Sequence, residues 1–250
     1  MIKKSPLIII GMHRSGTSFL SRCLEHFGVF MGYNKDVNNE SRVFMEHNEL
    51  LLAHHNSDWI EPKEVDITAM QFTNFQLLSH FGSLKKPFVL FKNLQKQKWG
   101  WKDPRNTFTL KYWLNLFPDA KVIHIYRNGI DVALSLQSRN KRMSKFNQFQ
   151  TEQLDSLVNG LKQWELYLDQ AFGYTYEGQL LHVCYERLIK KDPNEMELLE
   201  SFLGFSVKSY LQERAVEKET ATTELGDEKS AVEAQLKSSK WMYKLNYYQG

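Results

Sequence analysis

The chain has 250 residues, of which 42% are hydrophobic and 24% charged, values typical of a globular protein. This composition excludes a wholly disordered chain, a collagen-like fibre and a coiled-coil rod. The formal net charge is only +3, which suits a small anionic ligand and is weaker than expected of a dedicated nucleic-acid binder.

The segment 7–10 (LIII) is a continuous apolar run that predicts a strand buried on both faces. Apolar residues then recur at helical spacing over 17–27, and Gly28 follows where a helix would end. The segment 29–80 is polar and mixed, with helical periodicity around 46–55. The run 88–91 predicts a second buried strand.

The rest of the chain alternates strand and helix patterns. Strands are expected at 98–102, 121–126 and 180–184, and helices from Thr107 and at 131–139, 154–171 and 192–203. This alternation predicts an α/β fold with a P-loop-like central parallel sheet of four to five strands flanked by helices. We expect one domain over 1–250, with a core at about 5–205 and a charged helical tail with an aromatic end at 206–250.

Cysteine content and hydropathy restrict the environment of the protein. Cys23 and Cys184 cannot build a disulfide framework, and neither has a second ligand at zinc spacing. No apolar run approaches the ~20 residues that a membrane-spanning helix needs, and 7–10 is too short for the core of a signal peptide. We therefore expect a cytoplasmic protein with reduced thiols, no membrane span and no metal site.

The first motif, Gly11-Met12-His13-Arg14-Ser15-Gly16-Thr17-Ser18, joins the first predicted strand to the first predicted helix. Backbone N–H groups in such a loop, together with the helix N-terminus, form an anion-binding site. The glycine spacing matches the phosphate loop of ATPases and kinases. The lysine that should follow Gly16 is absent, however, and the cation of this loop is Arg14.

The second motif runs from Tyr126 to Ser135 (YRNGIDVALS). The strand 121–126 delivers Arg127 to its carboxyl end, where open α/β sheets bind ligands. Ser135 lies eight residues further on, inside the next predicted helix. An arginine and a hydroxyl placed in this way can hold one phosphate from two sides.

The two motifs together resemble those of the sulfotransferases that use 3′-phosphoadenosine 5′-phosphosulfate (PAPS), in particular the bacterial and tyrosylprotein branches. The segments Trp101-Lys102-Asp103-Pro104-Arg105 and Tyr185-Glu186-Arg187-Leu188 resemble further stretches of these enzymes. The resemblance covers about residues 5–205. The sequence departs from the family pattern at Gly129, where the family often has proline. The basic, glycine-bearing loop that the family usually has near its C-terminus is not evident in this sequence.

The resemblance implies PAPS as co-substrate, no metal, and sulfuryl transfer to a small-molecule, carbohydrate or peptide acceptor. The first motif would bind the 5′-phosphosulfate, and Arg127 with Ser135 the 3′-phosphate. The nucleotide-binding residues would be His13, Arg14, Ser15, Gly16, Thr17, Ser18, Arg127 and Ser135.

Catalysis would need cations at the reacting group and a base for the acceptor. The expected cations are Arg14 and Lys102. For the base, the resemblance points to the segment 39–47, with Glu46 ranked first and Glu40 second, and His13 and His47 as further candidates.

Two other functions are compatible with parts of the pattern. A magnesium-dependent P-loop kinase or NTPase would use the same loop, but the missing lysine after Gly16 disfavours it. A non-catalytic anion- or RNA-binding module is disfavoured by the low net charge.

Overall fold

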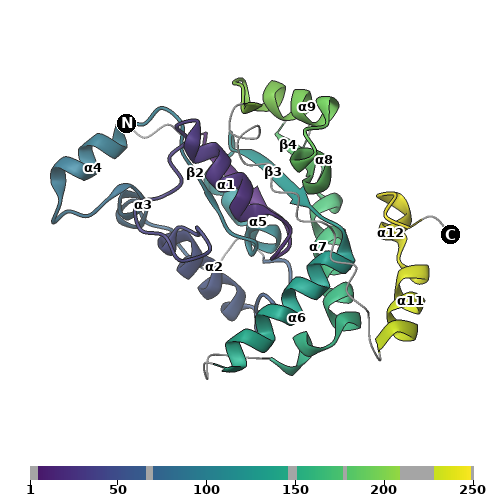
Figure 1. Ribbon diagram of the computed structural model, residues 1–250. Helices are drawn as coiled ribbons and strands as arrows, with labels where there is room; N and C mark the ends of the chain where they lie inside the picture. Colours follow the sequence, from purple (N-terminus) through teal and green to yellow (C-terminus); the bar gives the residue numbers. More distant parts are fainter. Residues whose placement is uncertain (1–4, 66–69, 146–150, 177–178, 209–227, 249–250) are drawn as a thin grey trace.

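The computed structural model describes residues 5–65, 70–145, 151–176, 179–208 and 228–248. Its centre is a sheet of four parallel strands in the order β2-β1-β3-β4 (Figure 1). The strands are β1 (Leu7–Ile10), β2 (Gly100–Lys102), β3 (Lys121–Tyr126) and β4 (Leu180–Cys184). The predicted α/β class and parallel sheet are confirmed.

Successive side chains of each strand point to opposite faces of the sheet, so each face is covered by its own helices. Leu7, Ile9 and Val183 pack on one face against α1 (Thr17–His26), α8 (Tyr185–Ile189) and α9 (Pro193–Leu203). Ile8, Ile10 and Val122 pack on the other face, whose helices are α2 (Arg42–His54), α5 (Asn106–Leu116), α6 (Gly129–Lys145) and α7 (Leu157–Gly173). The result is a three-layer arrangement that leaves the strand ends open.

The predicted strand at 88–91 is wrong, because these residues belong to helix α4 (Pro87–Leu94). Pro87 occupies the first helical turn, where its missing N–H and fixed φ are compatible with a helix. Phe88 and Phe91 are 80% and 62% exposed, whereas a buried strand would cover both. The strand that pairs with β1 on this side is the short β2.

Shorter elements lie at the two sides of the molecule in Figure 1. On the left, α3 (Asn74–Phe81) precedes α4; on the right, α11 (Lys229–Ser238) and α12 (Lys240–Lys244) form the last part of the chain. A 3₁₀ turn, η1 (Glu152–Asp155), precedes α7. Residues 209–227 of the expected tail lie outside the described residues.

The aromatic C-terminal end packs back onto α7. The Trp241 indole stacks on Phe172 and donates a hydrogen bond to Asp169. Within the part of the chain that the structure describes, no helix is both long and apolar enough to cross a membrane.

Candidate active site

The candidate site lies at the carboxyl ends of the four strands, where the chain leaves the sheet at Gly11, Asp103, Arg127 and Tyr185. Because all strands are parallel, these four exits share one edge of the sheet. Both sequence motifs therefore reach the same edge.

The first motif forms a tight loop that depends on two glycines. Gly11 has φ +132°, and a Cβ there would lie 2.3 Å from the Ile125 carbonyl oxygen. Gly16 has φ +96°, and a Cβ there would lie 2.3 Å from the Tyr185 ring. The Gly11 N–H donates to Thr107 Oγ1 at 3.0 Å, which ties the loop to α5. The loop is thus held close to both β3 and the end of β4.

The two motifs meet at Arg14. Its Nε donates a hydrogen bond to Ser135 Oγ at 2.8 Å, across 121 residues of sequence. Arg127 lies beside them, with Nη1 3.5 Å from the Arg14 carbonyl oxygen and Nη2 3.1 Å from Asp131. Partial desolvation, followed by the charges of Arg139, Arg142 and Arg127, lowers the pKa of Arg14. The structure therefore gathers several cations at one point, which favours an anionic ligand.

Buried polar atoms at this point lack hydrogen-bond partners. Ser15 Oγ and Arg127 Nε have none among the described residues, and Ser15 is 1% exposed. Both atoms can donate to an anion. Thr17 is buried at the start of α1, and the Ser18 hydroxyl donates to the Asn38 carbonyl at 2.6 Å. The loop residues thus fit an anionic phosphate or phosphosulfate group.

Glu40 and Lys102 form a buried ion pair next to this loop. Lys102 Nζ lies 2.9 Å from Glu40 Oε1, and the two side chains are 1% and 3% exposed. Burial, then the charge of Asp103, raises the pKa of Glu40, while Lys102 and Arg105 oppose this rise. A carboxylate with a raised pKa is well suited to accept a proton near neutral pH.

Arg105 also belongs to this cluster, although no separate role was expected for it from its position in the segment 101–105. Its Nη1 lies 3.3 Å from Glu40 Oε2 and 3.0 Å from Asp103, and its Nη2 lies 2.9 Å from Glu49. These carboxylates hold the pKa of Arg105 above its usual value despite desolvation. Its position directly after the strand-ending Asp-Pro pair was the available signal in the sequence.

The structure places the other two base candidates of the segment 39–47 differently. Glu46 is exposed on α2, and its carboxylate forms no hydrogen bond within the described part of the chain. His47 is buried and contacts the Tyr112 hydroxyl through Nε2 at 3.0 Å, and burial lowers its pKa to about 4. The geometry around Lys102 therefore favours Glu40 over Glu46, the reverse of the ranking from sequence.

His13 faces the same group of cations. Burial, together with the charges of Arg105, Arg139, Lys102 and Arg14, holds the pKa of His13 well below its usual value. Its imidazole is therefore neutral at pH 7 and available to donate or accept one hydrogen bond.

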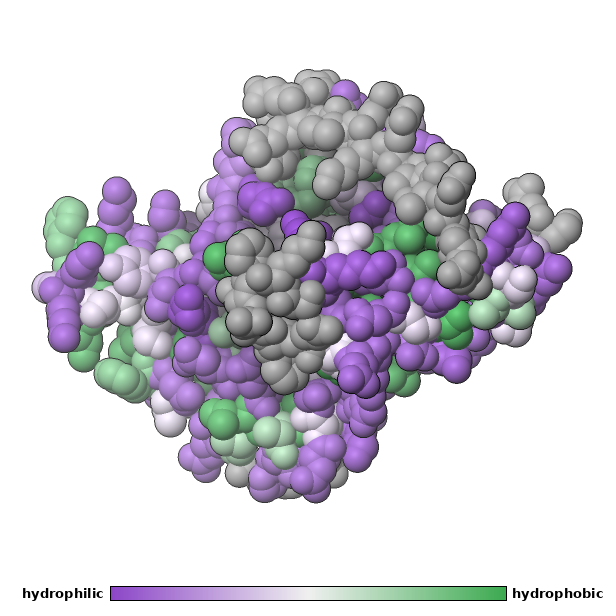
Figure 2. All heavy atoms as spheres, turned by 60° about the horizontal axis from the view of Figure 1, so that its bottom comes forward, coloured by the Kyte–Doolittle hydropathy of each residue, from purple (hydrophilic) through white to green (hydrophobic). Residues whose placement is uncertain are grey.

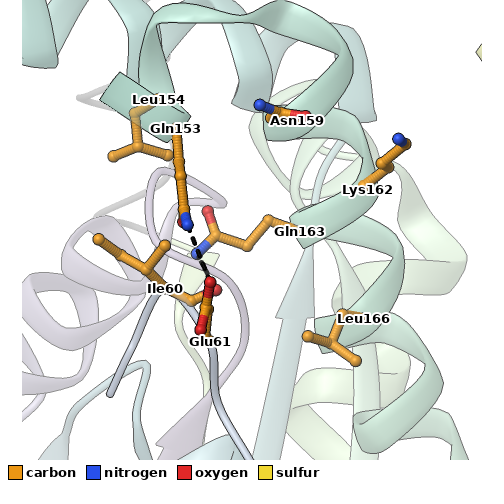
Figure 3. Close-up of a pocket in the computed structure, with 8 residues that line it drawn as sticks. All are labelled: Ile60, Glu61, Gln153, Leu154, Asn159, Lys162, Gln163 and Leu166. Carbon is orange, nitrogen blue, oxygen red and sulfur yellow. Dashed lines mark hydrogen bonds between the residues drawn. The ribbon is translucent and has the colours of Figure 1, made fainter. Parts of the chain in front are cut away.

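The loop at 58–61 holds an aromatic ring against His13. The Trp59 ring lies 4.6 Å from the His13 ring, and Gln163 Nε2 donates to the carbonyls of Trp59 and Ile60 at 3.0 and 3.1 Å. Figure 3 shows Gln163 reaching from α7 to this loop, where a pocket of about 300 Å³ opens beside Glu61. The loop that lines this pocket therefore also contacts the first motif, through Trp59 and His13.

A second set of contacts secures the turn after β3. Glu186 Oε1 accepts the Asn128 N–H at 2.8 Å, and Glu186 Oε2 accepts the Tyr247 hydroxyl, also at 2.8 Å. Arg127 lies over the Tyr185 ring, 5.1 Å from its centroid. The C-terminal end of the chain therefore supports the turn that carries Arg127.

The described residues contain no group of three or more His, Cys, Asp or Glu side chains arranged to hold a metal ion. Both cysteines are buried free thiols.

Comparisons with known proteins agree with this geometry. The model of the sulfotransferase family matches residues 6–209. The fold is similar to that of mouse sulfotransferase SULT7A1 complexed with PAP (13% identity, TM-score 0.55, 99% of this chain and 90% of that one). It is also similar to a sulfotransferase from Alicyclobacillus acidocaldarius (14%, 0.52, 93% and 91%) and to sulfotransferase STF9 from Mycobacterium avium (15%, 0.52, 100% and 78%). A comparison with curated proteins finds no match.

Proposed function

The chain belongs to the sulfotransferase family, and from this premise we propose that it transfers the sulfuryl group of PAPS to a hydroxyl or amine of an acceptor. One observation carries the proposal: the 2.8 Å contact between Arg14 and Ser135 unites the two nucleotide motifs, with Arg127 alongside. The ribose of this nucleotide carries one phosphate on O3′ and one on O5′. It therefore needs two neighbouring anion sites, one from each motif.

In this proposal the loop from His13 to Ser18 holds the 5′-phosphosulfate. The unpartnered Ser15 hydroxyl and the backbone N–H groups at the start of α1 are the donors. Arg127 and Ser135 hold the 3′-phosphate, and the unpartnered Arg127 Nε supports this assignment. The Tyr185 ring beneath Arg127 keeps its guanidinium in place.

PAPS, when bound, supplies a sulfuryl group attached to its 5′-phosphate. The phosphate is the leaving group when the sulfuryl group is transferred. Arg14 and Lys102 neutralise the charge that grows on the bridging oxygen as its bond to sulfur breaks. Glu40 accepts the proton of the acceptor hydroxyl or amine while the new bond to sulfur forms. Lys102 contacts Glu40 directly, so one cation orients the base and lies close to the reacting group.

A thermal-shift experiment without metal tests this function. In the presence of EDTA, adenosine 3′,5′-bisphosphate at a hundredfold excess over its dissociation constant adds about 2.7 kcal/mol of stability. For a chain of this size, that raises the melting temperature by about 5–10 °C. ATP with magnesium should raise it less, because ATP has no 3′-phosphate for Arg127. A larger, magnesium-dependent shift with ATP would refute the proposal in favour of a kinase or NTPase.

A further inference from the structure

The helix pair α3–α4 stands out from the rest of the surface by its exposed apolar side chains. Phe75, Leu84, Phe88 and Phe91 are between 62% and 80% exposed. Phe88 and Phe91 are three residues apart and so lie on one side of α4, and Leu84 lies in the turn before this helix. Exposed apolar residues grouped in this way mark an interaction surface.

The same segment is strongly basic. From Met70 to Trp101 the sequence contains five lysines and no aspartate or glutamate, so this stretch alone carries more positive charge than the net +3 of the whole chain. Lys98 lies over the Phe205 ring and points toward α9. The other four, Lys85, Lys86, Lys92 and Lys96, are exposed and pair with no carboxylate among the described residues.

The helices are well anchored, so their exposed faces are built features of the fold. Thr73 and Gln76 form a reciprocal capping box at the start of α3. Leu90 is buried and packs on Gly82, where a Cβ would lie 2.9 Å from the Leu90 Cα. With Leu90 turned inward, Phe88 and Phe91 must face outward on α4. Figure 1 shows α4 at the outer left of the molecule, far from α11 and α12.

We propose that α3–α4 is a docking surface for an anionic lipid bilayer, with Phe88, Phe91 and Leu84 entering the headgroup region and the lysines facing lipid phosphates. An interfacial helix combines an apolar face of Phe and Leu with flanking lysines, and this surface has both. Figure 2 shows the same mixture at its left margin, where hydrophobic residues stand among hydrophilic ones. The absence of acidic residues in the segment favours a negatively charged partner over a second copy of this chain, which carries the same positive surface.

The docking surface is connected to the candidate active site. A groove of about 430 Å³ lies against it, and its lining includes Tyr33, Phe75, Leu84 and Leu90. The Tyr33 N–H donates to the His80 carbonyl, and the His80 ring bonds the hydroxyl of Ser41, the neighbour of Glu40. These contacts link the docking surface to the segment that carries Glu40, a link that matters for catalysis only if the proposed function holds.

Vesicle sedimentation tests this inference directly. The full chain is mixed with phosphatidylcholine vesicles that contain either no anionic lipid or about 30% phosphatidylserine. We expect binding to the anionic vesicles that weakens as salt is raised, and little binding to the neutral ones. Neutralising Lys85 and Lys86 to Gln should weaken binding by about 25-fold, at about fivefold per lysine. Replacing Phe88 and Phe91 with Ser should weaken it by at least about tenfold.

Matched variants elsewhere on the surface serve as controls. Leu198→Ser removes a 56% exposed leucine on α9, and Lys229→Gln with Lys237→Gln removes two exposed lysines on α11. Both should bind anionic vesicles like the wild type. Failure of the wild type to bind, or equal loss in the controls, would overturn the inference. So would a dimer in solution that dissociates when Phe88 and Phe91 are replaced, since a second copy would then cover this face.

The vesicle test needs neither nucleotide nor turnover, so it is independent of the proposed function. If adenosine 3′,5′-bisphosphate fails to bind while the vesicles bind, only the nucleotide assignment fails. If nucleotide binds and vesicles do not, only the docking surface fails.

Discussion

Glu40 and Glu46 are six residues apart but have opposite surroundings. Glu40 is buried against Lys102 and Arg105, whereas Glu46 is exposed on α2. We therefore expect Glu40→Gln to lower the rate of sulfuryl transfer by ~10²–10⁴-fold, the usual contribution of a general base. Glu46→Gln should leave the rate nearly unchanged.

The measurement is single-turnover transfer to any hydroxyl or amine acceptor that the enzyme sulfates. Glutamine is nearly isosteric with glutamate but cannot neutralise Lys102 and Arg105, so the melting temperature of each variant is measured alongside as the control for folding. The rate of the wild type should rise with pH through the raised pKa of Glu40. A greater loss in Glu46→Gln than in Glu40→Gln would contradict the assignment.

The sequence could predict which residues reach the site but not how they pair. Spacing within each motif placed Arg14 and Ser135 on a loop and a helix, and the 2.8 Å contact between them follows from the parallel sheet. The choice between Glu40 and Glu46 depends on burial, which a polar segment without clear periodicity does not reveal. The role of Arg105 could not be predicted either, because its partner Glu40 lies 65 residues away in the sequence.

At the scale of elements, the loop between β1 and α1 depends on backbone conformations that only glycine adopts without strain. Gly11→Ala adds the cost of a positive φ, about 1–2 kcal/mol, and brings a Cβ within 2.3 Å of a backbone oxygen of β3. We expect a loss of more than about 3 kcal/mol in unfolding free energy and loss of nucleotide binding. Urea denaturation followed by circular dichroism measures the first effect.

Gly28→Ala is the matched control. Gly28 also has a positive φ, at +82°, but a Cβ there would meet no atom within 4 Å. Gly28→Ala should lower the free energy of unfolding by only about 1–2 kcal/mol and leave nucleotide binding intact. Equal losses in the two variants would mean that close packing of the loop on β3 contributes nothing.

Elements with a strong hydrophobic pattern were predictable and those shaped by tertiary contacts were not. The runs at 7–10, 121–126 and 180–184 are strands with those bounds, because strands of a parallel sheet covered by helices are rich in apolar residues. The run 88–91 looks the same in sequence but follows Pro87 and lies outside the sheet. A short apolar run cannot by itself distinguish a buried strand from an exposed helical face.

At the scale of the whole molecule, buried histidines should make stability depend on pH. Burial lowers the pKa of His47 and His182 to about 4 and of His80 to about 3, and holds the pKa values of His13 and His124 well below the usual range. Below pH ~6.5 the unfolded chain binds protons that the folded chain does not, so stability falls with falling pH. Each histidine contributes up to about 1.4 kcal/mol per pH unit.

The three histidines with pKa values of about 3 to 4 alone would remove up to about 8 kcal/mol within about two pH units, which is comparable with a typical folding free energy of about 5–15 kcal/mol. We expect the melting temperature to be nearly constant from pH ~7 to ~8 and to drop steeply between pH ~6 and ~4.5. Thermal melts in low-salt buffers across this range provide the measurement. A melting temperature that stays constant down to pH ~5 would show that these histidines are protonated in the folded protein.

The central claim is that Arg127 and Ser135 hold a 3′-phosphate beside the Arg14 loop. Isothermal titration of the wild type and Arg127→Ala with adenosine 3′,5′-bisphosphate and with adenosine 5′-phosphate tests it most directly. The substitution removes a charge-assisted contact worth about 1.5–3 kcal/mol, so bisphosphate affinity should fall by about 10- to 150-fold. Affinity for the monophosphate should not change, which controls for damage to the loop. Unchanged bisphosphate affinity, or an equal fall for both ligands, would contradict the account.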